Sequence, residues 1–503
     1  MPIKTRKSIL AVNEQVTAGV PVLADASGDF SVLREGFSMA PETDLLESDE
    51  LRDSLGTPKP ALGIERGTAS IPKYLKHSGV EGQKPDYSEM LKSAFGAEDV
   101  EGTEYDTVAS STTTEIKVDT GEGVNFRRGQ GLLIKSVPYS LRAVQSIATD
   151  DLELNFKLSG APASGVNLGK CVGYYPSDDN TTILTLDLFR GNGGMREVLA
   201  DAKVTTLDMV VNAGEYIEGN FEFQGTKYYF DPINVTGVSN NNDLDFYDGT
   251  NVMTATIEAK VYRDPHEFAA ALQAAMNTAT NVVDSYTVVY NDYGSDKGKF
   301  TLTSDGSTFE LRFGSGPNTP GMAAILGFTA TNKTGALTYT SNNVQSWASA
   351  FSTDFDDADP LVAKAGEIFM GGQNDNFNVC VETMNATLTN TVTENLCTSA
   401  ETGVDSVEVT NRVLEVTFTA TADQHDARLF KYYRTGESVQ FMFNFGEKSG
   451  GNWVPGTCVQ LYVPNATVLE FTPDDADGKA VFNVTLQAFV QEGGQGEVFL
   501  NLL

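Results

Sequence analysis

Alternation of apolar and polar side chains with a period of two dominates this chain. Runs rich in β-branched residues, most of them bounded by Gly, Asp or Asn, lie at 115–118, 131–136, 182–188, 413–419 and 439–445. Helical spacing is confined to a few short stretches, notably 87–95, 265–278 and 423–433. This pattern predicts a mainly β protein with a few packed helices.

Residues 41–71 interrupt the alternation with a long polar stretch that has no sustained period of two or of 3.6. Loops of this length inside compact domains are uncommon and are usually functional. Apolar residues recur through the stretch, although a free linker has no use for them: Leu45, Leu46, Leu51, Leu55, Leu62 and Ile64. We expect a loop that orders against a partner subunit through these side chains, with a disordered linker as the alternative.

Two further segments have a pattern of their own. Residues 111–178 suggest a small barrel of short strands, with turns at Gly129 and Gly131. Residues 240–343 predict an inserted module in which strands surround one well-specified helix. Asp264 can cap that helix, Pro265 suits its first position and Glu267 has the spacing of a capping box.

The inserted module is also expected to have a small hydrophobic core. Phe268, Leu272 and Met276 follow one face of the predicted helix. The apolar run at 321–328 predicts a short helical turn that closes this core. The connectors on both sides are rich in Asn and Ser, which favours insertion at an exposed loop tip.

Composition restricts the partners. The chain has 503 residues, with 68 Asp and Glu against 35 Lys and Arg, so its formal net charge is −33. Such a surface repels phosphate groups, so we do not expect the chain to bind duplex DNA tightly. The chain has no apolar run of about 18 residues and no apolar signal core, so we expect a soluble protein without a secretory address.

The residues able to carry chemistry are few and scattered. His77, His266 and His425 form no HExxH or HxH arrangement and are expected on the surface or in loops. The four cysteines contain no CxxC pair, which favours buried or half-buried free thiols over disulfides: Cys171, Cys380, Cys397 and Cys458. Arg127 and Arg128 are expected to be ion-pair partners rather than a phosphate site.

No catalytic, metal-binding or cofactor-binding residue is predicted. Acidic clusters at 243–248, 354–359 and 474–477 could offer oxygen ligands to Ca²⁺, but none has EF-hand spacing, and we expect solvated turns. The glycine-rich segments 163–170 and 191–194 lack the spacing of phosphate-binding loops, and no GxSxG motif is present. The chain is therefore not expected to be an enzyme or to need a cofactor.

The order of several segments resembles the major tail tube protein of a long-tailed bacteriophage with a flexible, non-contractile tail. The opening contains KTRKSILAVNEQVTAGVPV, EGFSMAPETDLLESDELRDSLG and RGTASIPKYLKHSGVEGQKPDYSEMLKSAFG in that order. MREVLADAKVTTLDMVVNAGEYIEGNFEFQGTKYYF follows at 195–230, and the C-terminal hairpin begins at VQLYVPNATVLEF. The resemblance covers about 1–110, 180–235 and 355–503.

This resemblance implies a β-sandwich with a flanking helix, assembled as homo-hexameric rings that stack into a tube. The tail tube domain would comprise 1–110 (arm, stacking loop and helix), 179–239 and 344–503. The small barrel 111–178 and the module 240–343 would be insertions, the module facing outward. The tube would stand in the virion tail after assembly in the host cytoplasm. Its lumen would hold the tape-measure protein and conduct double-stranded DNA to the host without specific binding. Terminator and tip proteins would be further partners, and no membrane would be involved.

Physical arguments agree with such a role. A ring subunit needs loops that bridge neighbours and edge strands that pair across subunits, and it needs no catalytic centre. Carboxylates lining a conduit would repel DNA and prevent it from sticking. The main alternative is a carbohydrate-binding or adhesive β-rich surface protein, since the composition is acidic and rich in Asn and Gly. A β-rich hydrolase is a third possibility.

Overall fold

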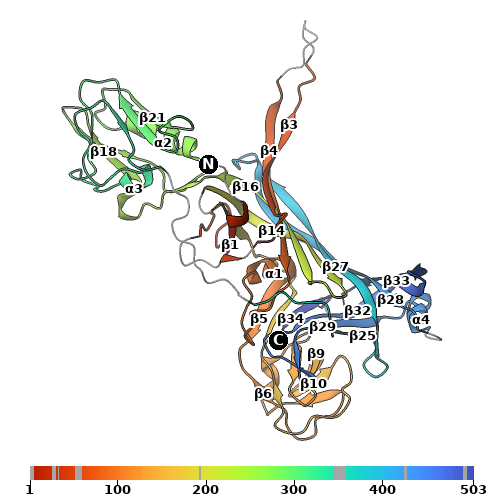
Figure 1. Cartoon of the computed structure of the whole chain (residues 1–503). Helices are drawn as coiled ribbons and strands as arrows, with labels where there is room; N and C mark the ends of the chain where they lie inside the picture. The colour runs from red at the N-terminus through yellow and green to blue at the C-terminus, as the bar shows by residue number, and fades with distance from the viewer. Residues whose placement is uncertain are drawn as a thin grey trace.

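Antiparallel strands form the framework of the computed structural model (Figure 1). The structure describes residues 5–24, 30–31, 33–50, 59–191, 194–344, 358–423, 427–490 and 496–503. Strand accounts for 48% and helix for 9%, which confirms the prediction of a mainly β protein.

One large sheet, called the main sheet below, organises the molecule. Each strand is hydrogen-bonded to the next in the order β3 (Ser38–Leu46), β4 (Ala61–Tyr74), β15 (Glu218–Gly225), β14 (Met195–Asn212), β27 (Val381–Leu396), β28 (Val404–Thr421), β33 (Lys479–Ala488) and β32 (Val459–Ala476). All of these pairs are antiparallel. Side chains therefore alternate between a face that packs on the core and a face that does not.

Two long strands leave the main sheet and continue into further pairings. The first half of β14 pairs with β16 (Lys227–Phe230) and with β13 (Leu184–Arg190), which continues to β1 (Ile9–Glu14) and β2 (Phe30–Ser31). The first half of β32 pairs with β29 (Val439–Phe445) and β34 (Phe499–Leu502). Beyond these lie β25 (Glu367–Gly371), β26 (Phe377–Asn378), β12 (Cys171–Pro176) and β5 (Gly96–Glu101).

The main core lies between these strands and contains helix α1 (Ser88–Phe95). The helix buries Met90, Leu91 and Phe95, as its predicted apolar face requires. It ends at Gly96, whose φ of +110° is a left-handed conformation that favours glycine. A Cβ atom at this position would lie 3.1 Å from the backbone of Ser177.

A second, six-stranded sheet curls into half a barrel at one end of the body (Figure 1). Its order is β6 (Tyr105–Asp106), β11 (Asn167–Leu168), β8 (Gly131–Ile134), β9 (Ser140–Ala148), β10 (Asp151–Leu154) and β7 (Glu115–Lys117). It has its own hydrophobic cluster. Buried amides join it to the body, since Asn501 Nδ2 donates to the Gly129 carbonyl at 3.0 Å and Gln460 Nε2 to the Arg142 carbonyl at 3.2 Å.

The predicted module together with the residues just before it, 233–343, is called the inserted segment below. It folds around a separate hydrophobic cluster. Its strands are β17 (Ile233–Asn234), β18 (Asp243–Tyr247), β19 (Val252–Thr256), β20 (Val261–Tyr262), β21 (Tyr286–Tyr290), β22 (Phe300–Ser304), β23 (Glu310–Leu311) and β24 (Thr338–Thr340), with helix α3 (Ala323–Leu326). Helix α2 (Pro265–Thr278) has the predicted bounds and buries Phe268, Leu272 and Met276. Asp264 caps it by accepting from the backbone N–H groups of His266 and Glu267.

The remaining elements are short. They are the 3-10 helices at Thr5–Lys7, Gly123–Asn125 and Val238–Asn240, the hairpin of β30 (Lys448–Ser449) and β31 (Asn452–Trp453), and helix α4 (Arg428–Thr435). Helix α4 overlaps the helical pattern predicted at 423–433, but it begins later and ends two residues beyond it, and residues 424–426 lie outside the described part of the chain.

His77 lies in a loop, as expected, although its side chain is buried there and its Nδ1 atom accepts from the Gly79 N–H at 2.9 Å. Two other expectations about the fold are wrong. The stretch 41–71 is largely two paired strands rather than a loop. In the acidic cluster 243–248, Asp245 is buried and not solvated, since it accepts from the Thr254 hydroxyl and from the backbone and side chain of Asn318.

Candidate assembly surfaces

A β-hairpin arm, defined here by its described residues 42–50 and 59–66, extends beyond the main sheet (Figure 1). The pairing of β4 with β15 ends at Gly67 and Gly225, so β3 is the only strand that pairs with the earlier described residues of β4. Residues 42–43, 45–46 and 61–62 are exposed and 63–66 are half-buried, so both faces of the described arm are largely open to solvent. This explains why its sequence shows no period, because neither face needs to be apolar.

Apolar side chains on the arm are unusually exposed. Leu45 pairs directly with Leu62, and the exposed fractions are 62% and 69%. Leu46 is 58% exposed on the same hairpin. Ile64 lies at the base, half-buried and close to Gly403 in the turn between β27 and β28. Leu51 and Leu55 fall outside the described residues, so the structure brings together only part of the predicted set.

Ion pairs hold the base of the arm against the main sheet. Arg66 contacts Asp44 of β3 at 3.0 Å and Glu394 of β27 at 2.7 Å. The Gln224 amide also donates to Glu394 at 2.6 Å. The Arg66–Glu394 pair thus ties the base of the arm to β27, although the exposed leucines of the arm remain open to solvent in the described structure.

The face of the main sheet that points away from the core is polar across β15, β14, β27, β28 and β33. Register places its residues in rows, one of which is Asn220, Asp208, Thr387, Glu415 and Gln487. The adjacent row is Glu218, Val210, Asn385, Thr417 and Thr485, and the next is Asn212, Thr383, Thr419 and Asn483. We call these rows the polar face.

The charged members of the polar face are all acids, namely Asp208, Glu218 and Glu415, and its other members are mostly Thr and Asn. A cation reaches its rim from outside, where Arg34 pairs with Glu218 at 2.8 Å. A groove of about 310 Å³ lies at the β33 side, lined mainly by Thr and Asn side chains. The face is therefore hydrated, acidic and free of side chains that bind phosphate.

The opposite face of the same strands explains why this arrangement forms. The next residue along each strand from the polar face belongs to an apolar row that is buried in the main core. This row is Val211, Met384, Phe418 and Val484. A slip of one residue would bury Thr and Asn and expose this apolar row, so the register is strongly specified. The sequence alone could not identify the polar face, because it arises from strands that are far apart along the chain.

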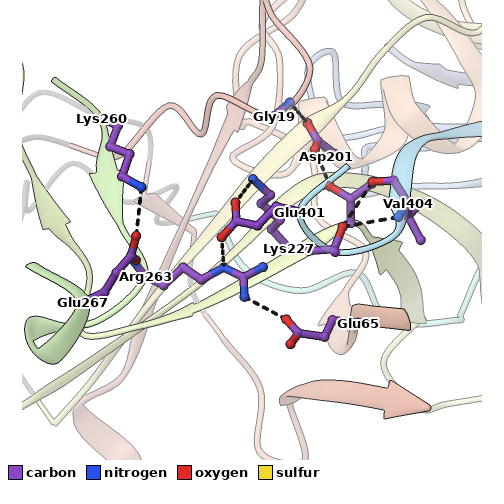
Figure 2. Close-up of polar contacts among 11 residues, drawn as sticks. Gly19, Glu65, Asp201, Lys227, Lys260, Arg263, Glu267, Glu401 and Val404 are labelled. Atoms are coloured by element: carbon purple, nitrogen blue, oxygen red, sulfur yellow. Dashed lines mark hydrogen bonds and ion pairs between the residues drawn. The ribbon is translucent and has the colours of Figure 1, made fainter. Parts of the chain in front are cut away.

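A cluster of ion pairs, called the clamp below, joins the inserted segment to the body (Figure 2). Arg263 of the segment contacts Glu65 at 2.7 Å and Glu401 at 3.4 Å. Lys227 of β16 also contacts Glu401, at 2.8 Å. The hydrogen bond to Lys227, helped by Arg263, lowers the pKa of Glu401. Glu401 is therefore the shared centre of the clamp.

We expect Glu401→Gln to loosen the inserted segment without unfolding either part. The clamp residues are partly exposed, so the loss of global stability should be below about 1 kcal/mol. Hydrogen exchange at the backbone amides of 258–263 should accelerate at neutral pH. Because the pKa of Glu401 is lowered, its contribution is present at neutral pH and is lost as the pH falls below the ordinary glutamate value and through the lowered one.

An exposed acid in the same segment, changed by Glu258→Gln, provides the control for this experiment. The hydrogen-exchange rates of the Glu258→Gln variant should match those of the original chain. Equal exchange rates in Glu401→Gln and the original chain at neutral pH would show that the clamp does not hold the segment.

The other candidate residues do not meet in a site. Within the described residues, no group of three or more His, Cys, Asp or Glu side chains could hold a metal ion. His266 pairs with Asp292 at 3.1 Å on the surface, and His425 lies outside the described residues. Arg127 pairs with Asp99 at 3.4 Å and stacks on Tyr175, as expected for an ion-pair partner.

All four cysteines are free thiols. Cys171 and Cys458 are buried and Cys397 is half-buried, as predicted, whereas Cys380 is exposed and corrects that expectation. Burial raises the pKa of the Cys171 and Cys458 thiols to about 12, which makes them unreactive at neutral pH.

The comparisons with known proteins assign no function to the chain, so the surfaces described above carry the functional proposal. No protein family model matches the chain, and no curated protein matches it. Among the described residues, no helix has both the length and the apolar character needed to cross a membrane.

Proposed function

We propose that this chain is a structural subunit that assembles with copies of itself into rings stacked as a hollow tube, through which a DNA genome passes. The polar face is the observation that carries the proposal. It is a broad sheet surface whose own charged residues are acids, placed on the outside of a well-packed core. This role agrees with the resemblance of the sequence to phage tail tube proteins, and the chain would not be an enzyme.

The chemistry of the polar face suits a conduit for DNA. Phosphate groups bind to Lys and Arg and release counterions, so a wall without these residues gives DNA little to hold. Thr and Asn side chains keep the surface hydrated and neutral, while Asp208 and Glu415 add repulsion. In a closed ring the acids of neighbouring copies would reinforce one another, since a narrow cylinder focuses the field.

The arm suits contact between successive rings. It extends from one end of the strands of the main sheet, so in a ring whose strands run along the tube it would reach the next ring. The resemblance implies six copies in each ring, with the tape-measure protein in the lumen and terminator and tip proteins at the ends. The clamp ties the inserted segment to β4, to β16 and to the turn between β27 and β28, and in the tube this segment would face outward.

The adhesive alternative gains little from the geometry. Carbohydrate-binding sites commonly present an aromatic ring to the sugar, but Trp453 is buried and Trp347 lies outside the described residues. The lining of the groove on the polar face includes no Tyr or Trp. Electron microscopy of the concentrated protein separates the two functions. Long hollow tubes or stacked rings support the proposal, whereas persistent monomers that bind glycans would favour the alternative.

Reversing charge on the polar face should make the tube retain DNA. In a variant with Asp208→Lys and Glu415→Lys, each subunit gains two cations, and we expect at least a tenfold increase in duplex DNA recovered with sedimented tubes at low salt. The retained DNA should resist nuclease because it would lie inside. Binding should fall steeply as salt increases.

A matched reversal on the inserted segment, Glu258→Lys with Asp292→Lys, controls for the change in total charge. Any DNA that it retains should be digested, since that segment would lie outside. If the two variants protect DNA equally, the polar face does not line the bore.

A further inference from the structure

Helix α4 lies at the edge of the main sheet (Figure 1), and its aromatic side chains form a patch with those of the neighbouring strands. Phe430 and Tyr433 of the helix surround Phe471 of β32, with ring centroids 5.7 and 6.3 Å from it. Phe482 of β33 continues the stack at 4.8 Å. Phe430 and Tyr433 are nevertheless 46% and 44% exposed. Large aromatic side chains left half open to water are typical of interaction sites.

The same helix is basic in a strongly acidic chain. Its sequence, RLFKYYRT, contains Arg428, Lys431 and Arg434 and no acid. Arg428 stacks on Phe377 at 3.9 Å, and Lys431 pairs with Glu437 at 2.8 Å. Arg434 is exposed at the end of the helix. The patch therefore combines aromatic rings with positive charge, and suits an acidic partner that carries aliphatic side chains.

The arm of this chain has that composition. Residues 42–50 contain five acids and no Lys or Arg, together with the exposed Leu45 and Leu46, and residues 59–66 contain Glu65 with Lys59 and Arg66, so acids remain in excess on the described arm. Leu62 adds a third exposed aliphatic side chain across the hairpin.

Strand register places the arm and the patch at opposite ends of the main sheet. The arm leaves at the end where β4 meets Gly225 and where the turn between β27 and β28 lies. Helix α4 follows the other end of β28, where Thr421 pairs with Val481. The arm and patch of one copy point away from each other, so the two surfaces cannot meet within one chain.

We propose that the patch on α4 is the docking site for the arm of a second copy of this chain. This inference rests on the proposed function, because it names the contact that would join one ring to the next. Leu45 and Leu62, which pair directly and share one face of the arm, pack on the aromatic rings, and the acids of the arm face Arg434. Since each copy offers an arm at one end and a patch at the other, the contact is head-to-tail and repeats without limit along the axis.

Crosslinking between two distinguishable variants tests the contact. Both carry Cys380→Ser and Cys397→Ser to remove the accessible thiols. One also carries Ser48→Cys on the arm and the other Thr435→Cys at the end of α4. After mixing, a short bismaleimide should join the two variants into a heterodimer, while neither variant alone should crosslink to itself.

Removing the rings should abolish the crosslink. Adding Phe430→Ser and Tyr433→Ser to the α4 variant should lower the yield at least tenfold, whereas Tyr293→Ser, at a side chain 86% exposed on the inserted segment, should leave it unchanged. Arg434→Glu should also lower the yield, and Asp49→Arg on the arm should restore it. This rescue excludes misfolding as the cause, and circular dichroism checks each variant.

The outcomes distinguish the docking site from the function. Tubes in the microscope with a specific crosslink support both proposals. Tubes without the crosslink overturn the docking site and leave the function standing. A specific crosslink without tubes keeps the docking site and overturns the tube. If neither appears, or if Ser295→Cys on the inserted segment crosslinks to the arm as well as Thr435→Cys does, the docking site is overturned.

Discussion

Replacing Asp187 with Ala is expected to lower the free energy of unfolding by about 3–5 kcal/mol, because the change leaves a buried arginine without its partner. Asp187 is fully buried in β13, and both of its carboxylate oxygens accept from the guanidinium of Arg196 in β14. One oxygen also accepts from the Ala24 N–H at 2.9 Å. The variant therefore also releases the segment that precedes β2.

Denaturation in urea measures this change, with the midpoint compared between variants of unchanged slope. The exposed acid Asp119, changed to Ala, is the control and should alter the free energy of unfolding by less than about 0.5 kcal/mol. A loss below about 1 kcal/mol for Asp187→Ala would show that the pair does not anchor β13 to β14.

Shortening the arm is expected to abolish tube growth while the subunit stays folded. Replacing residues 44–64 with Asn-Gly keeps the pair between Thr43 and Glu65 and closes the hairpin with a two-residue turn. It also keeps Glu65 for the clamp. The described residues of the deleted part are mostly exposed, and the lost pair of Asp44 with Arg66 is partly open to solvent, so the thermal midpoint should change little. Tube length, measured by negative-stain electron microscopy, should fall to single rings or monomers.

A gentler variant separates the leucines from the length of the arm. Changing Leu45, Leu46 and Leu62 to Ser should shorten the tubes at least tenfold, whereas Val283→Ser, at an apolar side chain that is 80% exposed on the inserted segment, should not. Full-length tubes from the shortened chain would contradict the role of the arm.

The sequence predicted those elements whose signals are local. Helix α2 was predictable to the residue because Asp264 and Pro265 mark its start and its apolar face is regular. Strand β29 was predictable because five of its seven residues are apolar, four of them Phe or Met. The parts of strands β3 and β4 that form the arm were not, because a hairpin largely exposed on both faces leaves no alternation to detect.

The candidate surfaces were less accessible to sequence reasoning because they depend on distant strands. Leu45 and Leu62 were identified as exposed contacts, but their direct pairing follows from register across the arm. The polar face combines residues from 208 to 487, and no local pattern joins Asp208 to Glu415. The acids Asp245 and Asp248 were wrongly expected to be solvated, because the partners that bury Asp245 include residues more than 60 positions away.

A cryo-electron microscopy reconstruction of the assembled protein tests the central claim most directly. We expect a hollow tube whose bore is lined by the polar face, with Asp208, Thr387 and Glu415 pointing inward and the inserted segment on the outer wall. The inner surface should be negative, and the arm should cross to the neighbouring ring. A tube whose bore is neutral or basic, or one that turns the polar face outward, would contradict the account.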